Sequence, residues 1–249
     1  MSDKSKPTIL AIDTSTDVCS VALCDAGEIR ELTVVAAREH TQRILPMVES
    51  ILIESSLTLA DIDALAVANG PGSFTGLRIG LSVAQGLAYG VGKPLIPIST
   101  LEAMANAVVR HEGVNQNQII IPAIDARMNE IYWSAYQLDA NNSINCVENE
   151  SVSTPMACYE FSHVSNKDNI TCVGSGWRYY SEEYIEKHTE ERLVDNKLKP
   201  DITFHATAYD IASLALSSFV KGDTINPIEA SPTYLRNEIT WQKRQRIRN

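Results

Sequence analysis

A short pattern occurs twice in this chain, once near the start and once near the middle. Ala11-Ile12-Asp13 is followed by the alternating segment Val18–Leu23, and Ala123-Ile124-Asp125 is followed by the alternating segment Ile131–Tyr136. Each copy predicts an apolar strand that ends in an aspartate, then a turn and a paired strand. A third strand and several helices are expected after each copy. The same order of elements at the start of each half predicts a duplicated α/β domain.

A duplication of this kind builds the actin-like, sugar-kinase and Hsp70 ATPase folds, in which two similar lobes each carry a mixed sheet with helices. We therefore predict this fold class. The expected divisions are an N-terminal lobe over 1–110, a C-terminal lobe over 111–228, and a C-terminal segment with a basic tail over 229–249. The first boundary rests on the polar, loop-like stretch His111–Gln118. In this fold class the cleft between the lobes holds a nucleotide, and the first hairpin approaches its phosphates.

Composition narrows the classes of function. The chain has 249 residues and a net charge of −10, which argues against a nucleic-acid footprint over the whole surface. It contains no run of 18 apolar residues, so we expect no membrane span. The five cysteines form no CxxC pair, and Met1–Lys6 lacks the apolar core of a signal peptide. We therefore expect a cytoplasmic protein with reduced thiols.

A glycine-rich loop, Asn69–Gly80, joins a buried strand over Ala64–Ala68 to a helix over Leu77–Tyr89. A strand, a tight glycine loop and a helix N-terminus can hold an anion, or can simply let the backbone turn where no Cβ fits. The helix is rich in small residues, which would let another helix approach closely. An amphipathic helix over Arg38–Ser55 precedes it. Packing on the chain's own sheet and an interface with a partner both remain open for this pair.

Four residues are candidates for contact with a nucleotide. Asp13 and Ser15 belong to the turn after the first strand, and Gly174 and Gly176 form a second glycine loop. An Asx or ST turn is the structural alternative for the first turn, and an ordinary turn for the second. Many actin-like ATPases have glycine at the position of Ser15, which argues against nucleotide hydrolysis here. Asp125 and Arg127, in the matching turn of the second half, could pair across the cleft or with each other.

Metal and serine-nucleophile chemistry are poorly supported. None of the five histidines lies three or four residues from another, so no helix presents a two-histidine metal site. The chain has no GxSxG sequence. We therefore predict neither a metal site nor a catalytic residue. The end of the chain is basic, and this tail could either contact RNA phosphates or remain solvated; it carries Arg236, Lys243, Arg244, Arg246 and Arg248 against Glu238.

Several motifs, in order along the whole chain, resemble the bacterial TsaB (YeaZ) family. They are Ile12–Thr16, His40–Pro46, Asn69–Gly80, Asp125-Ala126-Arg127 with Glu130-Ile131-Tyr132, and Pro232–Arg236. The resemblance implies the duplicated actin-like fold and a non-catalytic, accessory role in placing N6-threonylcarbamoyladenosine next to the anticodon of tRNAs that read codons beginning with A. The implied partners are TsaD, the catalytic paralogue that this subunit would scaffold and activate, and the ATPase TsaE. The tRNA would be contacted only indirectly, through the complex.

The resemblance also implies a site. The helices over Arg38–Ser55 and Leu77–Tyr89 would form a four-helix bundle with TsaD, or with a second copy of this chain in a homodimer. The implied interface residues are His40, Leu45, Val48, Leu52, Gly76, Arg78, Gly80, Ala84 and Leu87. No cofactor is expected for this chain itself, although ATP or ADP could bind at the junction with a partner. Thr100 and Met104 stand where the paralogue has its two metal-binding histidines.

Three other functions remain as alternatives. The chain could be an independent small-molecule kinase or a metallopeptidase of the same fold class, or a purely structural dimer. A kinase needs a competent phosphate loop, which Ser15 makes doubtful. A peptidase of this kind needs metal ligands, which the histidine spacing does not supply.

Overall fold

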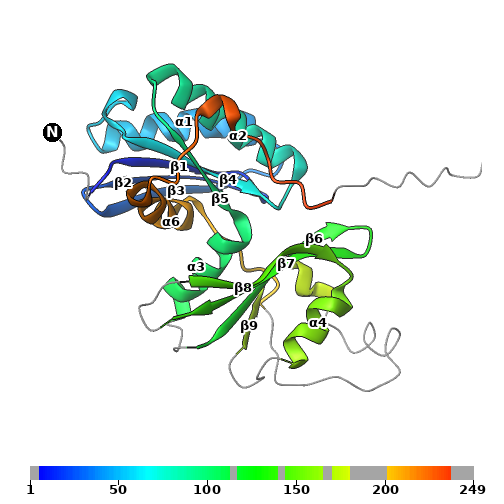
Figure 1. Cartoon of the computed structure of the whole chain (residues 1–249). Helices are drawn as coiled ribbons and strands as arrows, with labels where there is room; N and C mark the ends of the chain where they lie inside the picture. The colour runs from blue at the N-terminus through cyan, green and yellow to red at the C-terminus, as the bar shows by residue number, and fades with distance from the viewer. Residues whose placement is uncertain (1–5, 113–116, 140–143, 165–169, 180–200, 237–249) are drawn as a thin grey trace, which may run out of the picture.

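The computed structural model describes residues 6–112, 117–139, 144–164, 170–179 and 201–236 (Figure 1). A five-stranded sheet lies in the first half, with the strand order β3-β2-β1-β4-β5. Its strands are β1 (Ile9–Asp13), β2 (Val18–Asp25), β3 (Glu28–Val35), β4 (Ala64–Gly70) and β5 (Leu95–Ser99). The helices of this half are α1 (His40–Glu54), η1 (Leu59–Asp61), α2 (Phe74–Val91) and α3 (Thr100–Glu112).

A four-stranded sheet follows in the second half, with the order β8-β7-β6-β9. Its strands are β6 (Ile119–Arg127), β7 (Glu130–Leu138), β8 (Ile144–Ser153) and β9 (Ile170–Val173). The remaining elements are α4 (Pro155–Val164), η3 (Ser175–Tyr179), α6 (Ala208–Lys221) and η4 (Pro227–Glu229). The helix expected over Tyr179–His188 falls almost entirely outside the described residues.

The two sheets repeat one topology. In the first, β1 pairs antiparallel with β2 and parallel with β4. In the second, β6 pairs antiparallel with β7 and parallel with β9. The strands that carry the repeated sequence pattern therefore hold equivalent central positions. The predicted duplication and the two-lobe α/β fold class are confirmed.

Both faces of the first sheet are covered, which explains why every residue of β1 is buried. Figure 1 shows α1 and α2 on one face of this sheet and α6 on the other, with α3 between the two sheets. Leu10 and Ile12 point into the core under α1 and α2, whereas Ile9 and Ala11 point into the core that α3 and α6 share. This second core continues into the second lobe through Ile120 and Tyr136, so one apolar layer joins the lobes.

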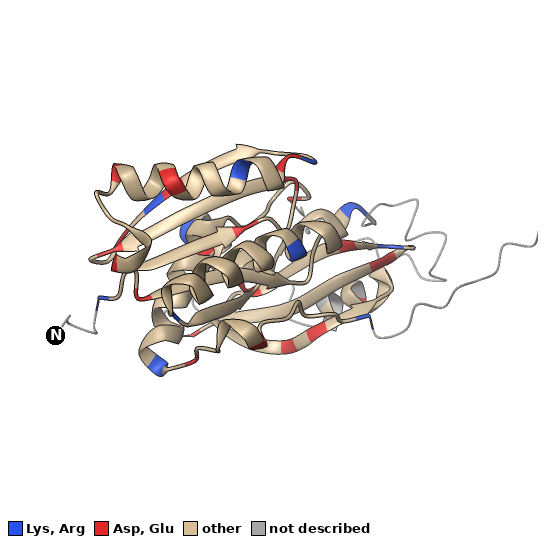
Figure 2. Cartoon of the chain, turned by 90° about the horizontal axis from the view of Figure 1, so that it is seen from above, with Lys and Arg blue, Asp and Glu red and all other residues tan. Residues whose placement is uncertain are grey.

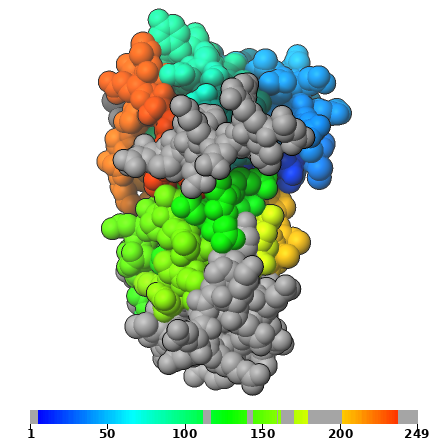
Figure 3. Space-filling view, turned by 90° about the vertical axis from the view of Figure 1, so that its right-hand side faces the viewer, coloured from blue at the N-terminus to red at the C-terminus, as the bar shows by residue number. Residues whose placement is uncertain are grey.

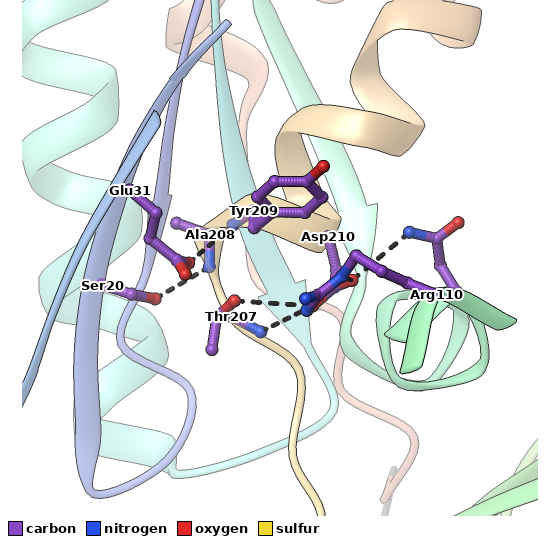
Figure 4. A network of polar contacts seen from close by, with 8 residues as sticks. Ser20, Glu31, Arg110, Thr207, Ala208, Tyr209 and Asp210 are labelled. Atoms are coloured by element: carbon purple, nitrogen blue, oxygen red, sulfur yellow. Dashed lines mark hydrogen bonds and ion pairs between the residues drawn. The ribbon is translucent and has the colours of Figure 1, made fainter. Parts of the chain in front are cut away.

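Helix α6 follows the second sheet in the chain but packs on the first sheet. Its anchor is Asp210, a fully buried residue whose carboxylate accepts hydrogen bonds from Arg110 Nε at 3.1 Å and Arg110 Nη2 at 3.0 Å (Figure 4). The same carboxylate accepts the backbone N–H of Thr207, completing a capping box. The next N–H group, that of Ala208, donates to Ser20 Oγ on β2 at 2.8 Å. A helix late in the sequence is thus tied to the first lobe by buried polar contacts.

The C-terminal segment crosses the first lobe and reaches the second. Ile225 bonds to Leu95 through both backbone groups and so covers the free edge of β5. Farther along, the Thr233 N–H donates to the Asn69 carbonyl at 2.8 Å. Arg236 then forms an ion pair with Glu130, at the start of β7. The orange and red segment on the upper part of Figure 3 is this connection, which contains the short helix η4.

The structure also shows the environment of the cysteines and the apolar content of the helices. Four of the five cysteines are buried, Cys146 is exposed, and all are free thiols. Within the described part of the chain, no helix has the length and apolar content that a membrane crossing requires.

Candidate partner surface and lobe turns

The glycine loop places α2 directly on the turn after β1. Ser73 caps the helix, because its Oγ accepts the N–H of Gly76 at 3.2 Å. A Cβ on Gly76 would lie 2.0 Å from the Thr14 carbonyl oxygen, and a Cβ on Gly80 would lie 2.4 Å from Thr14 Oγ1. The Thr14 hydroxyl donates to the Gly76 carbonyl at 2.7 Å. These glycines therefore serve close packing of the helix against its own lobe.

Most of the residues implied as a partner interface face inward. His40, Val48, Leu52, Gly76, Gly80 and Ala84 are buried. His40 Nε2 lies 2.9 Å from the Thr16 carbonyl oxygen, so this side chain closes the base of α1 onto the first hairpin. Leu87 is half-buried, while Leu45 and Arg78 are exposed. Gly76, Gly80, Ala84 and Ala88 thus form the stripe of α2 that faces the sheet.

The outer surface of α1 and α2 carries different residues. Ile53 is 68% exposed and Tyr89 is 66% exposed, and Leu45 adds a third exposed apolar side chain. Ser82 and Gly86 are also exposed on α2, between Arg78 and Tyr89. We call Leu45, Ile53, Ser82, Gly86 and Tyr89 the outer helix surface. Only Leu45 of this set was among the implied residues.

Arg78, the exposed charge at the start of α2, is held by the C-terminal segment. Its guanidinium carbon lies 3.7 Å from the centroid of the Phe74 ring, and its Nε donates to the Tyr234 hydroxyl at 2.9 Å. Among the described residues it has no carboxylate partner. Both residues of this contact lie in motifs that carry the family resemblance: Arg78 in Asn69–Gly80 and Tyr234 in Pro232–Arg236. The sequence did not show that the two motifs meet.

The turn after β1 is closed to solvent in this structure. Asp13, Thr14 and Ser15 are all buried. The N–H of Ser15 donates to Asp13 Oδ1 at 2.7 Å, and the carbonyl of Ser15 accepts the N–H of Ser73 at 2.8 Å. Burial raises the pKa of Asp13 to about 6, although the hydrogen bonds from Ser15 oppose this rise. The turn is an Asx turn in which Asp13 accepts the Ser15 N–H, the arrangement of the structural alternative.

The second glycine loop is packed as tightly. Gly174 has a φ of +101°, and a Cβ there would lie 2.3 Å from the Ala123 carbonyl oxygen and 2.5 Å from Met104 Cε. A Cβ on Gly176 would lie 2.9 Å from the carbonyl carbon of Ala123. Both glycines let the loop approach β6.

Asp125 and Arg127 pair with each other, one of the two arrangements that the sequence left open. Arg127 Nη1 lies 3.3 Å from Asp125 Oδ2, and the Arg127 N–H donates to Asp125 Oδ1 at 2.9 Å. Arg178 adds a contact that the sequence did not indicate, with its Nη1 at 3.2 Å from Asp125 Oδ2. Arg236, which the sequence assigned to the tail, contacts the same hairpin at the Ala126 carbonyl and at Glu130.

The positions that correspond to the paralogue's histidines lie at the start of α3. Thr100 and Met104 are both buried. The Thr100 hydroxyl has no hydrogen-bond partner among the described residues, and the Met104 methyl group fills the space beside Gly174. Across the described ranges there is no cluster of three or more His, Cys, Asp or Glu side chains that could hold a metal ion.

Comparison with known proteins places this fold in a family. A family model described as "TsaD: tRNA N6-adenosine threonylcarbamoyltransferase" matches residues 34–212. The chain is 42% identical to the Escherichia coli tRNA threonylcarbamoyladenosine biosynthesis protein TsaB over 94% of its own length and 97% of that protein. It is also 42% identical to the Haemophilus influenzae protein of the same name, over 95% and 96% of the two chains.

Solved structures agree with the sequence comparison. YeaZ from Pseudomonas aeruginosa is 35% identical, with a TM-score of 0.77 over 92% of this chain and 100% of that one. A second Pseudomonas aeruginosa structure, described as an uncharacterized protein with similarity to peptidase YEAZ, is 34% identical, with a TM-score of 0.79 over the same shares. The chain is 42% identical to two TsaB proteins over nearly its whole length, and it shares the two-lobe structure of YeaZ. It therefore belongs to the TsaB (YeaZ) family.

Proposed function

We propose that this chain is a non-catalytic subunit of the machinery that forms N6-threonylcarbamoyladenosine on tRNA. The observation that carries the proposal is the 42% identity to Escherichia coli TsaB over 97% of that protein, whose name states this pathway. The chain would act in the cytoplasm, where tRNA is modified. Its partners would be a TsaD-type transferase, which it scaffolds and activates, and a TsaE-type ATPase.

The accessory role is supported by the residues at the start of α3. A transferase that uses two histidines on a metal needs imidazoles at these positions, and Thr100 and Met104 cannot replace them. Met104 is packed against Gly174, so its thioether is part of the core. The chemistry would therefore reside in the TsaD-type partner.

The outer helix surface is the proposed contact with that partner. Exposed Ile53 and Tyr89 lie on two neighbouring helices, and apolar and aromatic side chains of this kind are typical of the central part of interfaces. Without the partner, the same surface would pair two copies of this chain. ATP or ADP at the junction would be an assembly ligand, with Asp13, Ser15, Gly174 and Gly176 as the candidate contacts.

A reconstitution tests the role. Threonylcarbamoyl transfer to tRNA is measured with a TsaD-type and a TsaE-type protein, with and without this chain. We expect activity only when both the chain and the TsaD-type protein are present. If the chain alone transfers the γ-phosphoryl group of ATP to a small-molecule acceptor, or cleaves peptides, the kinase or metallopeptidase alternative replaces the subunit role.

The partner surface is tested separately with matched variants. Ile53→Glu and Tyr89→Glu place a charge on the outer helix surface, whereas Val220→Glu places the same charge on an exposed apolar position of α6. We expect the first two to abolish co-purification with the TsaD-type protein and the third to leave it intact. Equal binding by all three variants would place the interface elsewhere, without affecting the reconstitution result.

A further inference from the structure

The end of the molecule where the C-terminal segment meets both lobes carries a cluster of arginines and aromatic rings. We call it the arginine–aromatic surface, and its residues are Phe74, Arg78, Arg127, Arg178, Tyr234 and Arg236. A chain of contacts makes it continuous. Arg78 bonds to Tyr234, Arg236 follows two residues later and bonds to the Ala126 carbonyl, and Arg127 shares Asp125 with Arg178. Figure 3 shows that both lobes and the C-terminal segment reach one side of the molecule.

The charge of this surface is opposite to that of the whole chain. Among the described residues, the carboxylates that contact its four arginines belong to Asp125 and Glu130, so positive charge is in excess. The Arg127 side chain is 82% exposed, and within the described ranges the neutral Tyr234 hydroxyl is the only polar partner of Arg78. The chain as a whole carries −10. Figure 2 shows blue segments, with red segments beside them, on the side where the described C-terminal segment ends; both colours also occur elsewhere on the two lobes.

The aromatic rings add a second property. Phe74 is 58% exposed and Tyr234 is partly exposed, with 5.9 Å between their ring centroids. The Arg78 guanidinium stacks on the Phe74 ring. The surface therefore carries planar side-chain groups next to a positive charge. Unpaired nucleic-acid bases stack on aromatic rings and on guanidinium planes, while arginines bind the phosphates between them. An acidic protein surface could pair with the arginines, but it would not account for the exposed aromatic rings beside them. Single-stranded RNA accounts for both features.

We propose that the arginine–aromatic surface binds single-stranded RNA, with Arg127 and Arg178 on phosphates and the rings of Phe74 and Tyr234 against unpaired bases. The identity of the RNA rests on the proposed function. The family resemblance implied that tRNA is contacted only through the complex, whereas this proposal adds a direct contact between the chain and the RNA. The sequence after Arg236 contains four further basic residues, Lys243, Arg244, Arg246 and Arg248, and one acidic residue, Glu238.

The test uses the full-length chain alone, with two fluorescent RNA probes: an anticodon stem-loop of a tRNA that reads a codon beginning with A, and a blunt duplex of equal length. Fluorescence anisotropy is measured over a range of salt concentrations. We expect the stem-loop to bind more tightly than the duplex, with an affinity that falls as salt rises. In Arg127→Gln/Arg178→Gln the affinity should fall about tenfold, and the salt slope should flatten by about 1.4 because two single-strand phosphate contacts are lost.

Phe74→Ala should weaken stem-loop binding by about fivefold or more and leave the salt slope unchanged, because a stacking contact carries no charge. The matched control is Arg30→Gln, which removes one exposed arginine from β3 outside this surface. Thermal unfolding of each variant confirms folding. Unchanged binding by the surface variants, or no binding by the wild-type chain, overturns the proposal.

Co-purification with the TsaD-type protein is measured on the same variants. Arg127 and Arg178 lie in the second lobe, apart from the outer helix surface, so this binding should be retained. Loss of co-purification with unchanged RNA binding identifies the surface as a protein contact and overturns the RNA proposal. The proposed function fails only if reconstitution with the wild-type chain fails, so the two results are distinguishable.

Discussion

Gly80 of α2 lies so close to Thr14 that a Cβ at this glycine would sit 2.4 Å from the Thr14 hydroxyl oxygen. That hydroxyl is held in place by its bond to the Gly76 carbonyl at 2.7 Å, so it cannot simply turn away. The contact sets the distance between the helix and the first hairpin. It also explains why small residues follow one another at every fourth position of the helix, at Gly76, Gly80, Ala84 and Ala88.

Gly80→Ala is expected to lower the free energy of unfolding by about 1–3 kcal/mol, the usual cost of forcing an extra methyl group into a packed core. Gly86→Ala is the matched control, since nothing lies within 4 Å of its Cβ position. That variant should gain about 0.5–1 kcal/mol, because alanine favours the helix. Urea unfolding measures both. Equal stability of the two variants would mean that α2 can move away from Thr14 at no cost.

Asp210→Ala is expected to lower the free energy of unfolding by about 3 kcal/mol, because it leaves the partly buried Arg110 guanidinium without its carboxylate and removes the cap of α6. Glu39→Ala serves as the control. It breaks the exposed ion pair with Arg43 and should cost no more than about 0.5 kcal/mol. Chemical unfolding followed by circular dichroism compares the two, and a cost as small for Asp210 as for Glu39 would contradict the anchoring role.

Asp13 should make stability depend on pH in an unusual direction. Burial raises its pKa from 3.8 to about 6, so between these values the folded state holds a proton that the unfolded state has released. The free energy of unfolding should therefore fall as pH rises through this window, by up to about 3 kcal/mol.

Asp13→Asn keeps an oxygen acceptor for the Ser15 N–H and removes the titration. The stability of wild type relative to this variant should decrease between about pH 4 and pH 6 and stay level above that range. Unfolding curves at several pH values give this difference. Parallel pH profiles for the two proteins would show that Asp13 does not titrate in this window.

Arg236→Ala should release the end of the C-terminal segment from the β6–β7 hairpin, because the side chain bonds to the Ala126 carbonyl and pairs with Glu130. The pair is partly exposed, so the loss of global stability should be about 1 kcal/mol or less. Local opening should increase, and limited proteolysis under native conditions should cut the segment near 231–236 faster than in wild type. Arg30→Ala, on β3, should be cut at the wild-type rate.

The duplicated architecture was predictable from residues close together in the sequence. An apolar run ending in Asp13 or Asp125, followed by an alternating segment, specifies a strand and its hairpin partner through local periodicity. The ends of α2 were predicted less accurately: the helix was expected over Leu77–Tyr89 and spans Phe74–Val91, because the hydroxyl cap Ser73 and the left-handed Gly92 were not used to place its ends. The family motifs extended these local signals over the whole chain.

The candidate site was predicted less well, because periodicity shows that a helix has a small-residue stripe but not what covers it. Gly80 and Ala84 were assigned to a partner surface, and the structure places them on the sheet of their own lobe. Ile53 and Tyr89 of the outer helix surface were not singled out, because an exposed apolar residue looks the same in sequence as a buried one.

The sequence by itself determined the strands, the helices and their repetition, because each depends on the spacing of side chains along a short stretch of backbone. Only the tertiary structure decided that α6 returns to the first lobe through Asp210 and Arg110, 100 positions apart, and that Tyr234 holds Arg78, 156 positions away. Such contacts depend on how whole lobes pack.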